Sequence, residues 1–307
     1  MSNITWITHP ACLRHEMGSG HPESPARLKA IDRRLREAGL LAGFDEKTAP
    51  LAPREALVRV HAAGLVDALL EARPESGTYI RVDPDTLMNS HSSEAAQAAA
   101  GAVLLGVDTV LAQGAGLAFC AVRPPGHHAE HRQAMGFCLF NSVAVGAAQA
   151  LASGVSRVAI LDFDVHYGNG TSDIFRNDPR VLVLNTYQDP LYPGWDSDPA
   201  CANLIDAPLA RGSGSGEFRD AVRSLWLPAI DTFAPELILV SAGFDAHEDD
   251  PLAGLNLTDE DYGWIASEIR QLAERHCKGR VVATLEGGYD TDALARSVEA
   301  FVRAFAD

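Results

Sequence analysis

The sequence has no pattern of cysteines that would build a disulfide framework or a thiolate metal site. Its five cysteines are scattered, no two form a C-x-x-C pair, and their number is odd. Such usage is typical of a reducing compartment. The first residues, MSNITWITHPACLRHE, also lack the basic segment and apolar core of a signal peptide. We therefore expect a cytoplasmic protein.

Clusters of basic residues and long uninterrupted apolar runs are missing too. The chain has 25 Lys and Arg against 41 Asp and Glu, a formal net charge of −16. Binding to nucleic-acid phosphates needs clustered Lys and Arg, so we expect no nucleic-acid partner. The most apolar long stretch, Ala98 to Val122, is interrupted by Asp108, Gln113 and several glycines. It is typical of a helix followed by a strand, and we expect no membrane span.

No internal repeat, low-complexity tract or linker divides the chain, and we predict a single domain over residues 1–307. Short apolar runs alternate with segments of helical length. The runs are Leu117–Val122, Val158–Leu161, Val181–Leu184, Leu237–Val240 and Val281–Leu285. The helical segments include Asn141–Ala152, Glu217–Phe233 and Thr258–His276. This alternation predicts an α/β fold with a mostly parallel central sheet and helices on both faces.

Polar clusters follow four of these apolar runs. The clusters read RPPGHHAEH, DFDVHYGNG, SAGFDAHEDD and EGGYD. In open α/β sheets ligands bind beyond the carboxyl ends of the strands. We therefore expect these four distant segments to converge on one active site there.

The second cluster carries acids and a histidine at alternate positions. In an extended chain, Asp162, Asp164 and His166 point to the same side. Together with Asp245, Asp164 and His166 offer two carboxylates and an imidazole, and a catalytic zinc uses three such ligands. Taken singly, an Asp after a strand is common in turns, and loop histidines or a packed tyrosine need no function. A metal-assisted hydrolase explains all the placements at once.

The chain resembles the zinc-dependent deacetylase superfamily, the histone deacetylase and acetylpolyamine amidohydrolase group, in its class II-like bacterial branch. The matching stretches are GHPESPARL (20–28), RPPGHHA (123–129), MGFCLFN (135–141), DFDVHYGNGT (162–171), YPG (192–194), SAGFDAHEDDP (241–251) and LEGGY (285–289). They occur in the family's order and span nearly the whole chain. The resemblance implies the arginase/deacetylase-like fold and hydrolysis of an acyl amide.

The resemblance also implies which residues bind metal. One Zn²⁺ per chain would be held by Asp164, His166 and Asp245. A monovalent cation, commonly K⁺, would lie nearby on backbone carbonyls and Asp162. Asn185 and Thr186 stand where the family's other ligands to that cation fall.

By the same resemblance, His127 and His128 are the tandem histidines, with Asp162 oriented toward His127 and Asn169 toward His128. A histidine of near-neutral pKa can take a proton and return it, and we assign this role to His128. His127 beside an anionic Asp162 would favour its cationic form. Tyr289 would donate a hydrogen bond to the developing oxyanion.

Four residues are implied for substrate binding. Gly136 would present its carbonyl to the substrate amide, Phe137 and Tyr192 would wall a narrow channel, and Leu252 would lie at its mouth. Polyamine-preferring relatives of the class II type can place a glutamate at the position of Leu252. We therefore expect acylated lysine in peptides or proteins, or other small N-acyl amines, as substrates.

Three alternatives stay open. The first is an acetylated polyamine, whose charge would be met by Asp83, Asp85 or Glu248 on the rim. The second, from a different functional class, is a catalytically silent acyl-lysine binder. The third concerns assembly, because the sequence leaves oligomerisation undecided.

Some residues depart from the family's pattern or fall outside it. Tyr167 and Tyr187 replace histidines that many relatives carry, which puts the lining of the pocket in question. Six further histidines are interpreted as surface or capping residues: His9, His15, His21, His61, His91 and His276. Of these, His21 lies in a loop that we expect near the channel rim.

Overall fold

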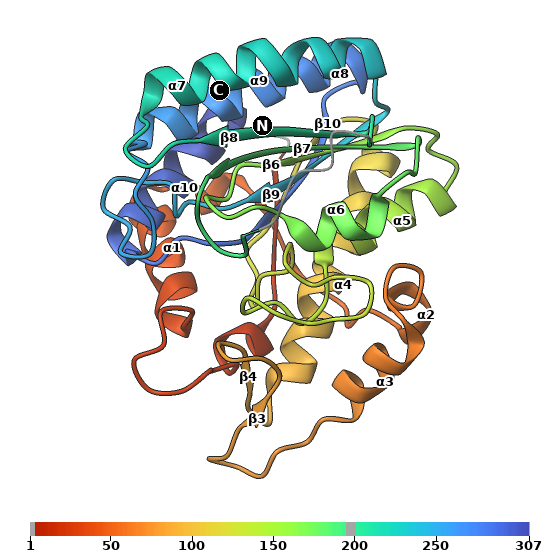
Figure 1. The fold of residues 1–307 in the computed structure, drawn as a ribbon, viewed down its shortest axis with the longest axis vertical. Helices are drawn as coiled ribbons and strands as arrows, with labels where there is room; N and C mark the ends of the chain where they lie inside the picture. Colours follow the sequence, from red (N-terminus) through yellow and green to blue (C-terminus); the bar gives the residue numbers. More distant parts are fainter. Residues whose placement is uncertain (1–3, 195–200, 307) are drawn as a thin grey trace.

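The computed structural model describes residues 4–194 and 201–306. Eight strands form one sheet in the order β2-β1-β5-β10-β9-β6-β7-β8 (Figure 1). Their bounds are β1 Ile4–Thr8, β2 Asp45–Thr48, β5 Gly116–Cys120, β6 Val158–Asp162, β7 Val181–Gln188, β8 Leu204–Leu209, β9 Leu237–Ala242 and β10 Arg280–Leu285. Every neighbouring pair in this sheet is parallel. A separate antiparallel hairpin joins β3, Ile80–Arg81, to β4, Leu87–Met88.

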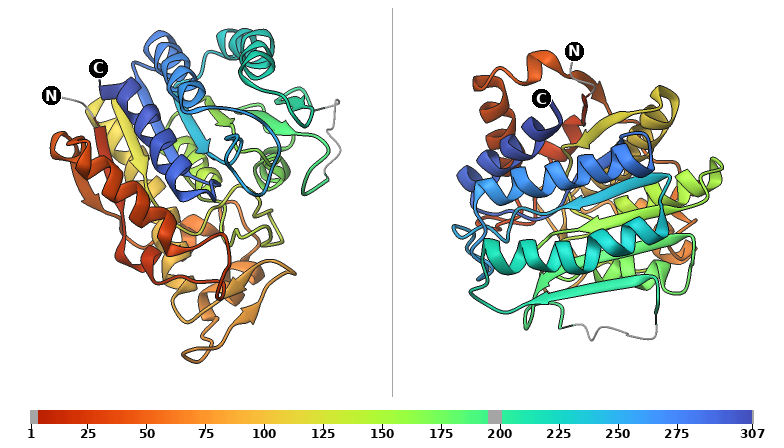
Figure 2. Two further views of the ribbon diagram at one scale, coloured as in Figure 1. Left: turned by 90° about the vertical axis from the view of Figure 1, so that its left-hand side faces the viewer. Right: turned by 90° about the horizontal axis from the view of Figure 1, so that it is seen from above.

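Helices cover both faces of the sheet, as predicted (Figures 1 and 2). One face carries α1 (Pro25–Glu37), α9 (Asp259–His276), α10 (Thr291–Ala306) and the stretch formed by α7 (Ser215–Ala221), the π-helical turn η3 (Val222–Trp226) and α8 (Leu227–Phe233). The other carries α4 (Ser92–Gln113), α5 (Ser142–Ala152) and α6 (Asn169–Phe175). The short helices are η1 (Pro10–Leu13), η2 (Leu41–Gly43), α2 (Arg54–Leu57) and α3 (Ala63–Glu71).

Helix α4 has the length and apolar composition of a membrane span, but 72% of its most apolar window is buried inside the protein. It packs against the sheet and beside α5 at close range. A Cβ atom at Gly106 of α4 would lie 2.8 Å from Val282 of β10. The apolar composition of α4 is therefore accounted for by its place in the core.

The sequence predicted β5, β6, β7, β9 and β10, because their apolar runs are buried on both faces of the sheet. It also predicted the helical segments that form α5, α7 to α8, and α9, but not α10. It did not single out the short buried strand β1, or β2, whose residues DEKT are mostly exposed at the sheet edge, or β8 at the opposite edge. Edge strands lack the continuous apolar pattern of central ones. Helix α1 begins at Pro25, directly after Ser24, whose side chain makes no capping hydrogen bond.

The four strands that precede the polar clusters are neighbours. β5, β10, β9 and β6 occupy contiguous positions in the middle of the sheet. Because these strands are parallel, their carboxyl ends lie at one edge. The polar segments at positions 123–131, 162–170, 241–250 and 286–290 are thus brought together, as the sequence predicted.

Candidate active site

Two carboxylates and an imidazole converge beyond the ends of β6 and β9. One oxygen of Asp164, one oxygen of Asp245 and one ring nitrogen of His166 all lie within 4.8 Å of one another. His166 Nδ1 is 3.0 Å from Asp164 Oδ1 and 3.2 Å from Asp245 Oδ2. This is a donor set of the kind that binds zinc and similar ions.

The backbone packs closely around Asp164 and Asp245, so that two neighbouring positions have no space for a side chain. A Cβ atom at Gly243 would clash with Asp164, and one at Gly287 would clash with Asp245. The amide of Gly287 donates to Asp164 Oδ2 at 2.8 Å, and that of Val165 to Asp245 Oδ1 at 2.9 Å. Asp245 Oδ2 is buried yet accepts no hydrogen bond from the described residues. A buried carboxylate oxygen that no hydrogen bond satisfies, 3.2 Å from an imidazole nitrogen, suits a cation bound between them, so the residues present suit a divalent metal.

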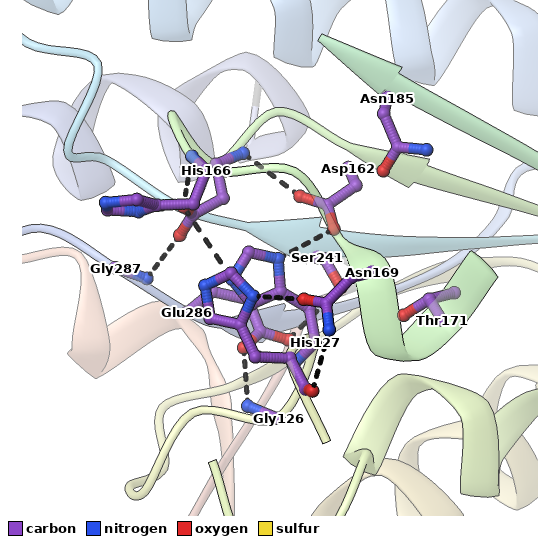
Figure 3. A network of polar contacts seen from close by, with 12 residues as sticks. Gly126, His127, Asp162, His166, Asn169, Thr171, Asn185, Ser241, Glu286 and Gly287 are labelled. Carbon is purple, nitrogen blue, oxygen red and sulfur yellow. Dashed lines mark hydrogen bonds and ion pairs between the residues drawn. The ribbon is translucent and has the colours of Figure 1, made fainter. Parts of the chain in front are cut away.

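His127 is held from both sides (Figure 3). Its Nδ1 lies 2.9 Å from Asp162 Oδ2, and its backbone amide donates to Glu286 Oε2 at 3.2 Å. The same oxygen of Glu286 accepts from Gly126 at 2.6 Å, while its other oxygen accepts from Ser241 at 3.1 Å. Glu286 was not recognised from the sequence as a site residue. Glu286 connects the loop that carries His127 and His128 to β9 and β10.

His128 has a neutral partner. Its Nδ1 lies 2.7 Å from Asn169 Oδ1. The Asn169 amide nitrogen donates to Glu130 Oε1 at 2.8 Å, so the amide oxygen must be the atom that faces His128. His128 therefore donates from Nδ1, and its Nε2 is left as a proton acceptor. Glu130 is a second residue that the sequence reasoning missed.

The two histidines differ in charge because of these partners. Burial lowers the pKa of His127, but the charges of Asp162 and Asp164 outweigh burial and raise its pKa well above the ordinary value. Burial and the neighbouring positive charge of His127 hold the pKa of His128 well below its ordinary value. His127 is thus favoured as a cation and His128 as a neutral base.

Tyr289 stands on the other side of the cluster, on the loop after β10. Its ring meets Phe137 edge-on, with centroids 5.9 Å apart, and the Arg27 guanidinium lies 5.0 Å from its ring centroid. Burial raises the pKa of Tyr289 well above its ordinary value, against the opposing charge of Arg27. The phenol therefore stays protonated at neutral pH and can donate a hydrogen bond.

A cavity of about 190 Å³ opens onto this cluster. Its lining residues are Asp85, His128, Gly136, Phe137, His166, Tyr192, Leu252 and Tyr289. All four sequence-predicted substrate residues are among them. His127 and Asp162 lie behind the wall, almost fully buried. Of the two histidines, only His128 faces the cavity.

The hairpin β3–β4 holds one wall of the cavity in place. Phe137 has a left-handed backbone with φ of 69°, which is strained for a residue with a Cβ atom. Its amide donates to the hydroxyl of Thr86 at 2.9 Å, and the amide of Gly136 donates to Asp83 Oδ2 at 2.9 Å. At the rim, the ring centroids of His21 and Phe137 are 4.7 Å apart, as the sequence led us to expect for His21.

A comparison with known protein families matches the histone deacetylase domain over residues 21–305. The chain belongs to the histone deacetylase family. It is 37% identical to a histone deacetylase-like amidohydrolase of Pseudomonas aeruginosa, over 92% of this chain and 75% of that protein. It is 33% identical to type-2 histone deacetylase 2 of Dictyostelium discoideum over 97% of this chain, and spans 20% of that protein's length.

Solved structures agree with this assignment. The crystal structure of the HDA15 HD domain superposes with a TM-score of 0.93 at 32% identity, covering 99% of this chain and 88% of that one. The resemblance inferred from the sequence is thereby confirmed, as is the α/β fold. Membership of the histone deacetylase family supports an activity of the deacetylase or deacylase type.

Two positions that depart from the family's pattern lie away from the cavity lining. The rings of Tyr167 and Tyr187 pack against each other with centroids 4.8 Å apart. The Tyr167 hydroxyl donates to Asp206 Oδ2 at 3.3 Å. Neither tyrosine is among the residues that line the cavity.

Two of the six further histidines were interpreted wrongly as surface or capping residues. His15 is fully buried and its Nδ1 lies 2.8 Å from the Ser92 hydroxyl. His61 is 1% exposed, and its Nε2 accepts the backbone amide of Asn141 at 2.9 Å. Burial lowers the pKa of His61 to about 4, so it serves as a neutral hydrogen-bonding core residue. Short-range sequence patterns do not reveal partners that lie 77 and 80 residues away.

Proposed function

We propose that the protein is a zinc-dependent amidohydrolase that removes acetyl or other short acyl groups from lysine side chains or related amines. The observation that carries the proposal is the placement of His128 and Tyr289 in one cavity with the converging Asp164, His166 and Asp245. Those three residues would hold the ion. When bound there, zinc supplies Lewis acidity for activating water and polarising an amide carbonyl.

The chain's own groups complete the chemistry. His128 takes a proton at Nε2 and returns it to the leaving amine, as a neutral base facing the cavity. His127 stays charged between Asp162 and Glu286, and stabilises negative charge that develops in front of it. The Tyr289 hydroxyl donates to the oxygen of the substrate carbonyl. Phe137 and Tyr192 enclose the alkyl chain, and the Gly136 carbonyl accepts from the substrate amide.

The lining of the cavity mouth favours acyl-lysine as the substrate. Leu252 lines the mouth and offers no charge to a distal ammonium group. Of the three acidic residues considered as a replacement, Asp83 is engaged by the amides of Gly136, Asp85 and Thr86. Asp85 lines the cavity, and Glu248 is not part of the lining. Among the described residues that line the cavity, Asp85 is then the one carboxylate left for a polyamine, at an exposed position where a charge pair contributes little.

A potassium ion near the zinc site is a further part of the proposal. Asn185 Oδ1 is buried and accepts no hydrogen bond from the described residues. It lies beside Asp162 Oδ2, because both atoms would meet a Cβ atom placed at Gly168. Oxygen atoms gathered in this way suit a hard cation. Asn185, Asp162 and the adjacent backbone, including that of Thr186, would hold it.

Substrate profiling of the purified, zinc-loaded protein tests this function. We expect higher kcat/KM for acyl-lysine peptides and small acyl-lysines than for acetylspermidine or acetylputrescine. Preference for the polyamines over every acyl-lysine substrate would show that the rim supplies the missing charge. Binding of acyl-lysine without any turnover in a sensitive assay would instead support a silent acyl-lysine binder.

A further inference from the structure

A buried aspartate outside the cavity links two of the residues that line it. Asp250 is 7% exposed and lies on the loop after β9, five residues beyond Asp245. Its Oδ1 accepts the backbone amide of Leu252 at 2.9 Å. Its Oδ2 accepts the backbone amide of Tyr289, on the loop after β10, at 2.7 Å. One carboxylate therefore joins the mouth of the cavity to the tyrosine.

The first of these contacts is local and the second is not. Accepting the amide two residues ahead is an ordinary turn contact of aspartate, especially before a proline such as Pro251. The contact with Tyr289 spans 39 residues and has no role in forming that turn. Both oxygens of a buried carboxylate are thus satisfied, but only one of them is needed for the local fold.

The segment that leads to Tyr289 is held by backbone contacts up to Gly288, and Asp250 holds Tyr289 itself. Gly287 and Gly288 directly precede it, and Gly288 has a φ of 121°, a conformation that residues with a Cβ atom rarely adopt. Beyond Leu285, Glu286 and Gly287 still form backbone hydrogen bonds with Ala242 and Phe244, and the Gly288 carbonyl accepts from Arg27 Nε at 2.6 Å. These bonds end at Gly288, one residue before Tyr289. The amide that Asp250 accepts is that of Tyr289 itself, closer to the ring than any strand contact.

We propose that Asp250 is a positioning residue that fixes the direction of the Tyr289 hydroxyl by holding the Tyr289 backbone against the Leu252 loop. The inference rests on the proposed function, in which Tyr289 donates to the substrate oxygen. Asp250 is not part of the cavity lining and acts through Tyr289. Its loss changes turnover more than substrate binding.

Two substitutions separate this role from that of a turn former. Asp250→Ser keeps a short acceptor for the Leu252 amide but does not reach Tyr289, and Asp250→Asn keeps the size of the side chain while removing one acceptor oxygen. We expect both to lower kcat roughly tenfold or more, as for a lost charged hydrogen bond, with KM within about threefold. Asp249→Asn is the matched control, because Asp249 is exposed and pairs with Arg296 at 3.1 Å. Its kcat should change by less than about twofold.

A double-mutant cycle then shows whether Asp250 acts through Tyr289. In a Tyr289→Phe background the Asp250 substitutions should lower kcat by less than about threefold, because the hydroxyl that they misplace is already absent. Equal losses in both backgrounds would overturn the proposal. Wild-type kcat in Asp250→Ser would do so as well, since only the turn contact would then matter.

Hydrogen exchange provides a readout that needs no activity. We expect faster amide exchange in residues 286–290 of Asp250→Ser than in the wild type or Asp249→Asn, at similar melting temperatures. Unchanged exchange in this segment would contradict the restraint. A wild-type protein without deacylase activity would refute the proposed function, whereas the exchange result would still decide whether Asp250 holds the Tyr289 loop.

Discussion

His128 Nδ1 lies 2.7 Å from the side-chain oxygen of Asn169, and this contact assigns the two ring nitrogens of His128 to different tasks. The amide nitrogen of Asn169 is committed to Glu130, so the oxygen accepts and His128 donates. Nε2 is then the basic atom, on the one tandem histidine that lines the cavity. His127 has a carboxylate in the corresponding place and differs in charge for that reason.

The first prediction concerns this pair of histidines. His128→Ala should lower kcat by roughly 10²-fold or more, because it removes the group that carries the proton. His127→Ala removes a charge and should be less damaging to the proton-transfer step. Steady-state kinetics of both variants on an acetyl-lysine peptide checks the order. Near wild-type turnover in His128→Ala, together with loss in His127→Ala, would reverse the assignment.

The pH profile follows from the environment of His128. Its pKa is lowered below the ordinary value of 6.5, and the neutral form is the active one. Activity should therefore be retained above that lowered pKa and fall only as pH drops through it, well below 6.5. In Asn169→Asp a carboxylate replaces the amide and raises the pKa of His128, so the acidic limb of kcat/KM moves to higher pH. An acidic limb at the same pH in both proteins would contradict this account.

Removal of the Tyr289 hydroxyl gives a third prediction. Tyr289→Phe should keep the fold and the metal content but lose roughly 10²-fold or more in kcat, because one donor to the oxyanion is lost. Metal analysis and circular dichroism serve as controls beside the rate measurement. A variant that turns over at more than about a third of the wild-type rate would remove Tyr289 from the mechanism.

The hydrogen bond between the Phe137 amide and Thr86 of the β3–β4 hairpin gives a fourth prediction. Thr86→Val has nearly the same shape but leaves the amide of the strained Phe137 without its acceptor. We expect kcat/KM to fall about tenfold, as for a buried hydrogen-bonding group left unpaired. Thr78→Val is the control, because Thr78 is exposed and its hydroxyl bonds only to a nearby carbonyl. Equal effects of the two substitutions would show that the contact does not shape the channel.

Substrate preference provides a fifth prediction. Leu252→Glu places a carboxylate at the cavity mouth and should shift the ratio of kcat/KM toward acetylspermidine by roughly tenfold relative to an acyl-lysine peptide. Leu252→Gln controls for polarity without charge. No shift in the glutamate variant would show that specificity is decided elsewhere on the rim, with Asp85 as the first residue to test.

The sequence predicted the central strands and the convergence of four polar segments, because buried parallel strands carry continuous apolar runs and end at a common edge. It did not identify Glu286, Glu130 or Asp250 as site residues. Glu286 contacts Gly126 across 160 positions, and Asp250 contacts Tyr289 across 39. Such contacts follow from packing in three dimensions, which no local pattern encodes. The burial of His15 and His61 was missed for the same reason.

The central claim is metal-dependent deacylation in the cavity formed by His128, Tyr289 and the Asp164, His166 and Asp245 cluster. The most direct measurement is the rate of acetate release from an acetyl-lysine peptide by one protein sample as purified, after exhaustive chelation, and after zinc is added back. We predict turnover that is lost on chelation and restored at about one zinc ion per chain. Full turnover after verified removal of the metal would contradict the account.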